Sequence, residues 1–140
     1  MTHESAGVAE RAFHITGLYP YSGTYLSGAD YGLFAVTGQA ADKDRFKAPT
    51  LRNIERSAPY MHDGSLATLN DVIDFYEAGG RVLTEGPRAG DGRAHPGKSP
   101  FIRGFTLTAQ ERQDLLDFLA SLTDERFLTD PRFAAPNAQK

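Results

Sequence analysis

The chain has 140 residues, which is enough for one domain with one modest hydrophobic core. Its net charge of −3 gives no electrostatic reason to expect nucleic acid or an anionic membrane as a partner. No apolar run is long enough to cross a bilayer, so we expect no membrane insertion. Residues 1–5 have neither the basic nor the apolar region of a signal peptide, so none is expected in this chain.

The sequence contains no cysteine. This excludes disulfides, thiolate nucleophiles, cysteine-based zinc or iron–sulfur sites, and attachment of haem c through a Cys-x-x-Cys-His motif of the chain itself. The 14 glycines and 8 prolines indicate many turns and little regular structure. A domain so rich in loops often depends on a cofactor, a metal or a partner surface in addition to its own core.

The first half of the chain predicts two helices after a long irregular stretch. Residues 1–45 show no clear periodicity, and we expect mostly loop with one short helix near the start. A helix of one or two turns is expected over 50–56, ended by the proline at 59. Thr68 is the expected N-cap of a longer helix, whose apolar stripe leads to Tyr76 and which Gly79 and Gly80 terminate.

The second half predicts one strong helix between irregular segments. Residues 81–105 form an unusually long loop, which is typically functional or wrapped around something. Thr108 and Glu111 make a capping box, and the helix that they open is expected to run to about Ser121. Residues 124–140 are expected to be a tail. The predicted fold class is therefore mainly α, with long loops.

The four histidines do not share the helical spacing of a metal site, and each is more often structural than a ligand. His62 stands out because it lies in a bent Pro-Tyr-Met-His-Asp-Gly-Ser segment just before a helix. The residues alone leave it open as functional or as part of a turn. By the same reasoning Tyr76 is a core aromatic with a satisfied hydroxyl, and Met61 fills space in the core.

Several ordered motifs nevertheless resemble the C-terminal part of the bacterial di-haem cytochrome c peroxidase and MauG family. A Phe-His-Ile-Thr-Gly segment is similar to the family's Phe-His-Asn-x-Gly, with Ile15 in place of Asn. The resemblance covers roughly 10–130, and its strings are Phe46–Ile54, Ala58–Ser65, Ala67–Leu69, Val72–Gly80, Leu107–Thr108 and Asp114–Thr123.

The resemblance implies a cytochrome c-like haem domain in which Tyr76 is the sixth ligand of a haem iron. Members of this family carry either Met or Tyr at this position. A Met thioether raises the reduction potential, whereas an anionic Tyr phenolate favours ferric and higher oxidation states. Tyr76 therefore points to a MauG-like oxidase that draws oxidising equivalents from hydrogen peroxide.

The resemblance also implies roles for seven further residues. His62 is the implied catalytic residue, and Met61 and His14 are implied to contact the cofactor. Lys47 and Arg52 are plausible partners for haem propionates; exposed cations beside a helix are the alternative. Calcium, the family's second cofactor, would be bound by the backbone carbonyls of Ser57 and Pro59 together with groups from elsewhere.

In the family, haem c is attached through a Cys-x-x-Cys-His motif, whose expected position precedes Phe13. We therefore interpret residues 1–140 as a partial domain that starts after this motif, with an N-terminal haem domain or partner chain supplying the rest. Periplasmic localisation is implied, as is a small redox protein or a protein substrate as a further partner. The alternative functions are an electron-transfer or binding module without peroxide chemistry, or a non-functional fragment.

Overall fold

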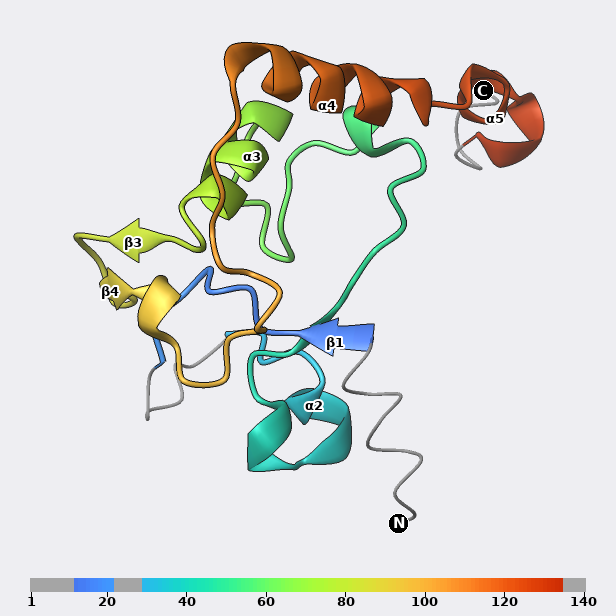
Figure 1. The fold of residues 1–140 in the computed structure, drawn as a ribbon. Helices are drawn as coiled ribbons and strands as arrows, with labels where there is room; N and C mark the ends of the chain where they lie inside the picture. The colour runs from blue at the N-terminus through green and yellow to red at the C-terminus, as the bar shows by residue number, and fades with distance from the viewer. Residues whose placement is uncertain (1–11, 22–28, 135–140) are drawn as a thin grey trace. The chain divides into compact units, whose positions relative to one another are not determined.

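The computed structural model describes residues 12–21 and 29–134 (Figure 1). The chain divides into two compact units. Unit 1 comprises Met1–Pro49 and Asn70–Leu107, and unit 2 comprises Thr50–Leu69 and Thr108–Lys140. Each unit is thus built from two separate stretches of chain. The short helix expected near the start of the chain lies outside the described residues.

Unit 1 contains two small antiparallel ribbons. Strand β1 (Phe13–His14) pairs with β2 (Phe46–Lys47), and β3 (Val82–Leu83) pairs with β4 (Gly90–Asp91). The short helices α2 (Phe34–Thr37) and η1 (Ala40–Asp42) lie between β1 and β2 in sequence, and η3 (Gly92–Ala94) directly follows β4. Four apolar residues are the buried core of this unit: Ile15, Leu18, Ile73 and Phe75.

Helix α3 (Leu69–Glu77) carries two of these core residues and ends as the sequence predicts. The Gly79 amide donates to the Tyr76 carbonyl, and the Gly80 amide donates to the Phe75 carbonyl. Gly79 has φ +70°, a left-handed conformation that costs glycine little because it has no Cβ. This pattern is a Schellman C-cap, so the two glycines fix where the helix stops.

Unit 2 is built on η2 (Ile54–Arg56), α4 (Ala109–Ser121), α5 (Glu125–Thr129) and η4 (Pro131–Phe133). The one- or two-turn helix expected over 50–56 is a single 3-10 turn. Helix α4 ends at Ser121, as expected, and its Leu119 is buried together with Tyr60. The described part of the expected tail thus contains two short helices.

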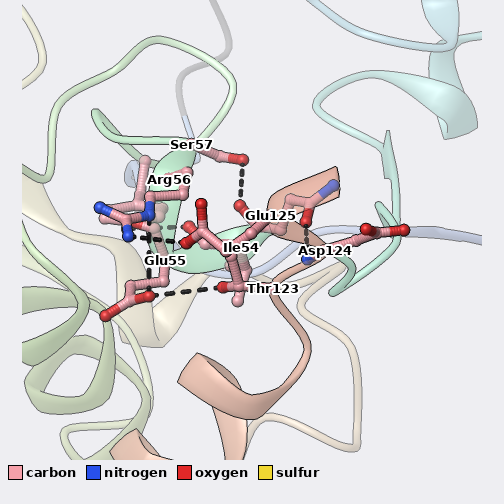
Figure 2. A network of polar contacts seen from close by, with 9 residues as sticks. Ile54, Glu55, Arg56, Ser57, Thr123, Asp124 and Glu125 are labelled. Atoms are coloured by element: carbon pink, nitrogen blue, oxygen red, sulfur yellow. Dashed lines mark hydrogen bonds and ion pairs between the residues drawn. The ribbon is translucent and has the colours of Figure 1, made fainter. Parts of the chain in front are cut away.

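A polar network fastens the start of this tail to η2 (Figure 2). The Arg56 guanidinium lies 2.9 Å from the Glu125 carboxylate, and the Thr123 hydroxyl donates to Glu55. Asn53 adopts a left-handed conformation; its amide donates to the Leu122 carbonyl, and its side-chain oxygen accepts from the Asp124 amide. The ion pair is exposed and contributes little to stability alone. The two hydrogen bonds of Asn53, one from its backbone and one to its side chain, therefore define this junction.

The capping box at the start of α4 gives a stability prediction. The Thr108 hydroxyl accepts from the Glu111 amide, and the Glu111 carboxylate accepts from the Thr108 amide. We expect Thr108→Ala to lower the free energy of unfolding by about 1 kcal/mol, because one helix-end amide loses its acceptor. Urea denaturation measures this loss, and Thr108→Ser, which keeps the hydroxyl, is the control. A Thr108→Ala midpoint equal to that of the serine variant would contradict the assignment.

The same box makes the stability depend on pH. The Thr108 amide and hydroxyl hold the pKa of the Glu111 carboxyl below its usual value. Because folding lowers this pKa, the contribution is present above the pKa of the unfolded chain and is lost as pH falls through the folded one. The difference in the free energy of unfolding between wild type and Thr108→Ala, measured by urea denaturation, should therefore become smaller in acid.

The expected predominance of helix is not confirmed. Within 12–21 and 29–134, only α3 and α4 are longer than five residues, and much of the rest is turn or irregular backbone with small sheets. The loop expected over 81–105 contains the β3–β4 ribbon and η3, and the rest of it is turn or irregular backbone. No helix among the described residues has both the length and the apolar character needed to cross a membrane.

Candidate haem-facing site

The side chain of Tyr76 lies in the last turn of α3, next to the buried ring of Phe75. The two rings meet edge to face, with their centroids 5.1 Å apart. Burial raises the pKa of the Tyr76 phenol above its ordinary value. The phenol oxygen makes no hydrogen bond with any residue of 12–21 or 29–134. The ring is thus packed while the oxygen has no protein partner in the described part of the chain.

This arrangement suits a ligand for a hard cation. Tyr76 is half-buried, and none of the described residues hydrogen-bonds its oxygen, so the oxygen is open to a ligand bond. Because burial favours the neutral phenol, ionisation of Tyr76 needs a compensating positive charge. Ferric iron is such a charge and would displace the phenol proton. The residue therefore fits the iron-ligand role that the sequence analysis expects for it.

Two other expected cofactor contacts, His14 and Lys47, lie in the β1–β2 ribbon of unit 1. His14 is opposite Phe46 and Lys47 is opposite Phe13, so the ribbon brings the two residues close together. The His14 ring lies edge-on to the Phe101 ring, with centroids 6.2 Å apart. The Lys47 ammonium donates to its neighbour Ala48 at 3.3 Å and is exposed. Both side chains come from one small two-stranded element.

Met61 and His62 lie in a tight loop of unit 2. A bridge between Tyr60 and Leu66 closes this loop, with the Tyr60 amide 2.7 Å from the Leu66 carbonyl. Met61 has φ +70°, which is unusual for a residue with a side chain, and His62 beside it is exposed. The closed bridge and the left-handed backbone together present the His62 imidazole to its surroundings.

Unit 2 also contains Ser57 and Pro59, which are expected to bind calcium, and Arg52, one of the two residues expected to pair with haem propionates. The carbonyls of Ser57 and Pro59 accept no hydrogen bond from the described residues, and both residues are exposed. No group of three or more His, Cys, Asp or Glu residues suitable for a metal occurs in the described ranges. Arg52 lines a groove of about 540 Å³ between 50–52 and 121–124, and its guanidinium has no described partner.

One buried histidine was not singled out from the sequence. In unit 1, His95 is only 7% exposed, its Nδ1 accepts from the Gly97 amide, and its Nε2 has no hydrogen-bond partner among the described residues. Its closest acid is Asp44, with Nε2 and Oδ2 3.7 Å apart. The Pro-Gly turn after His95 is the only sequence signal for this geometry, and the acid lies 51 positions earlier in the sequence.

Comparisons with known proteins agree with the resemblance. The chain is 39% identical over 94 residues to the cytochrome-c peroxidase IdrP1 of Pseudomonas sp. (strain SCT), covering 67% of this chain and 22% of the relative. It is 32% identical over 125 residues to the methylamine utilization protein MauG of Methylorubrum extorquens, covering 88% of this chain and 30% of the relative. No protein-family model matches the chain.

A solved structure shows the same relationship. The chain matches a MauG-like protein associated with microbial copper homeostasis with a TM-score of 0.80 and 54% sequence identity, over 89% of this chain and 38% of that one. This match shows a cytochrome c peroxidase-like fold. The chain spans less than a third of the length of the two curated relatives above, so it corresponds to one part of such proteins. The chain belongs to the family of bacterial cytochrome c peroxidases and MauG proteins.

Proposed function

We propose that this chain forms the haem-pocket portion of a MauG-like di-haem peroxidase or oxidase that consumes hydrogen peroxide and moves electrons through haem. One observation supports the proposal above the others. The Tyr76 ring is fixed by packing, while its oxygen has no partner among the described residues. Tyr76 is also the residue at which the family resemblance expects the iron ligand.

A haem bound at this position would supply the redox chemistry, because its iron would hold oxidising equivalents drawn from the peroxide. Tyr76 tunes that chemistry through its charge. An anionic phenolate stabilises ferric and higher oxidation states, whereas a thioether stabilises the ferrous state. The tyrosine therefore suits a protein that stores oxidising equivalents better than one that carries single electrons at high potential. This contrast favours the oxidase over a simple electron carrier.

The remaining candidate residues have supporting roles in this proposal. His62 would move protons: its imidazole would take one from one oxygen of hydrogen peroxide and give one to the other, which leaves as water, while haem would supply the two electrons that break the oxygen–oxygen bond. Lys47 and Arg52 neutralise the haem propionates, since both are exposed cations. His14 and Met61 are the further residues proposed to contact the cofactor.

Other parts of the proposal concern groups outside this chain. Haem c would be attached through cysteines of an N-terminal haem domain or of a partner chain, because this sequence has none. Calcium would bind the Ser57 and Pro59 carbonyls together with oxygens from that second part. A small redox protein or a protein substrate would exchange electrons with the assembled protein, in the periplasm.

The direct test adds hydrogen peroxide to the complete haem-loaded protein, that is, this chain together with its haem-bearing domain or partner chain. We expect the haem absorption to show oxidation beyond the ferric state, reversed by an added reductant. An absorption spectrum that peroxide leaves unchanged, in protein that still exchanges electrons with a small cytochrome, would support the electron-transfer alternative. Protein that does neither would support the non-functional alternative.

A further inference from the structure

Residues 98–107, which we call the strap, make three hydrogen bonds to the C-terminal end of α3 and the residues just after it. The Lys98 ammonium donates to the Gly79 carbonyl at 2.7 Å, and the Phe105 amide donates to the Glu77 carbonyl at 3.2 Å. The Leu107 amide donates to the Glu77 carboxylate at 2.9 Å. These residues all belong to unit 1. The strap therefore satisfies the carbonyl of Glu77, one of those that a helix end leaves without partners, and the carbonyl of Gly79 just after the helix.

The strap also lies against the helix end without room for side chains. A Cβ on Gly79 would lie 3.0 Å from the Gly104 nitrogen, and a Cβ on Gly104 would lie 2.8 Å from the Glu77 carbonyl oxygen. Both glycines have positive φ, +70° and +79°. The backbones thus approach each other closely where the hydrogen bonds hold them. This end of α3 is fixed from outside the helix as well as by its own C-cap.

Tyr76 lies in the last turn of α3, next to the residues that the strap hydrogen-bonds. Its carbonyl accepts from the Gly79 amide, and Gly79 in turn accepts from Lys98. Tyr76 also directly precedes Glu77, which the strap holds through both its backbone and its carboxylate. Since no described residue holds the phenol oxygen, the direction of that oxygen is set by the ring packing and the backbone of this turn.

We propose that Lys98 and Glu77, through the strap, are positioning residues that hold the Tyr76 oxygen at the haem iron. The ammonium of Lys98 is especially suited to this role, because a cation at a helix C-terminus interacts favourably with the helix dipole. The inference rests on the proposed function, in which Tyr76 is the iron ligand. It adds residues that never touch the haem but set the strength of the tyrosine–iron bond.

The test measures the reduction potential of the Tyr76-ligated haem in the complete haem-loaded protein. Lys98→Met removes the ammonium and keeps the aliphatic stem. Loss of a charge-assisted hydrogen bond is expected to weaken the ferric tyrosine–iron bond about tenfold. This weakening raises the one-electron potential by about 59 mV. Lys98→Arg restores a donor and should return the potential toward the wild-type value.

Lys43→Met is the matched control, because the Lys43 ammonium lies over the Tyr31 ring at 4.9 Å in the same unit, a contact that involves neither α3 nor the strap. It should leave the potential unchanged. Glu77→Asp withdraws the carboxylate from Leu107 and is the second test variant if Lys98→Met does not fold; it should raise the potential in the same direction.

The outcomes separate this inference from the proposed function. If Tyr76→Phe leaves the haem spectrum unchanged, the ligand assignment is wrong. If Tyr76→Phe changes the spectrum while Lys98→Met and Glu77→Asp match Lys43→Met, the ligand assignment stands and the strap has no positioning role. A shift in Lys98→Met that Lys98→Arg does not reverse also overturns the positioning role, because it then reflects general loss of packing.

Discussion

Replacing Tyr76 by phenylalanine is expected to raise the reduction potential of the ligated haem by on the order of 0.1 V or more, since axial ligands set haem potentials over a range of about 0.8 V. The phenylalanine ring keeps the edge-to-face contact with Phe75 but carries no oxygen. The variant should therefore fold like the wild type, while the iron loses an anionic ligand that stabilises its ferric state. Potentiometry with optical detection measures the shift, and the haem absorption reports the changed ligand set.

The folded state must be checked in the same preparation. The phenylalanine ring keeps the contact with Phe75, so the variant should still unfold in one cooperative transition. A cooperative transition together with a shifted potential assigns the effect to the iron. An unchanged potential would mean that Tyr76 is a core aromatic only. The electron-transfer or binding alternative would then gain support.

Replacing His62 by glutamine is expected to slow the reaction with hydrogen peroxide by about 10²- to 10⁴-fold, the usual contribution of a positioned acid–base group. Glutamine has a similar size and can still donate a hydrogen bond, but it does not transfer protons near neutral pH. Because His62 is exposed in its closed loop, the substitution should leave stability nearly unchanged. Stopped-flow absorption after mixing with peroxide measures the rate.

Ser65→Ala is the matched control for this experiment. Ser65 lies in the same loop, where its amide donates to the Asp63 carboxylate, and alanine keeps that amide. The control should therefore react with peroxide at the wild-type rate. A His62→Gln protein that reacts as fast as the control would remove His62 from the catalytic role. A control as slow as His62→Gln would instead show that the reaction depends on the loop conformation.

The helices are the part of the fold that can be predicted from the sequence, because their signals are local. Thr108 and Glu111 are three residues apart, and the capping box that they predict is present. Gly79 and Gly80 likewise end α3 where expected. The two-stranded ribbons cannot be predicted in this way, because β1 has only two residues and pairs with a strand more than thirty residues away. Two residues cannot show the alternation that identifies a strand.

The candidate site shows the same division between local and distant signals. The sequence places Tyr76 on the apolar face of a helix, and the residues alone favour a core role with a satisfied hydroxyl. The structure shows a packed ring whose oxygen has no described partner. The strap could not have been predicted, because the contact between Glu77 and Leu107 spans 30 positions. The same holds for the buried histidine at 95, whose acidic neighbour comes from a distant loop.

The junction at Asn53 has a consequence for how the protein is made. Its side chain accepts a hydrogen bond from an amide 71 positions further along the chain. The first stretch of unit 2 can therefore make its contacts with the second only after residue 124 has been synthesised. All of unit 1, in contrast, has been synthesised once the ribosome reaches Leu107. Residues 50–69 leave the ribosome well before the stretch that completes their unit. A nascent chain halted soon after Leu107 has every residue of the strap and of the helix that carries Tyr76, but only the first of the two stretches of unit 2.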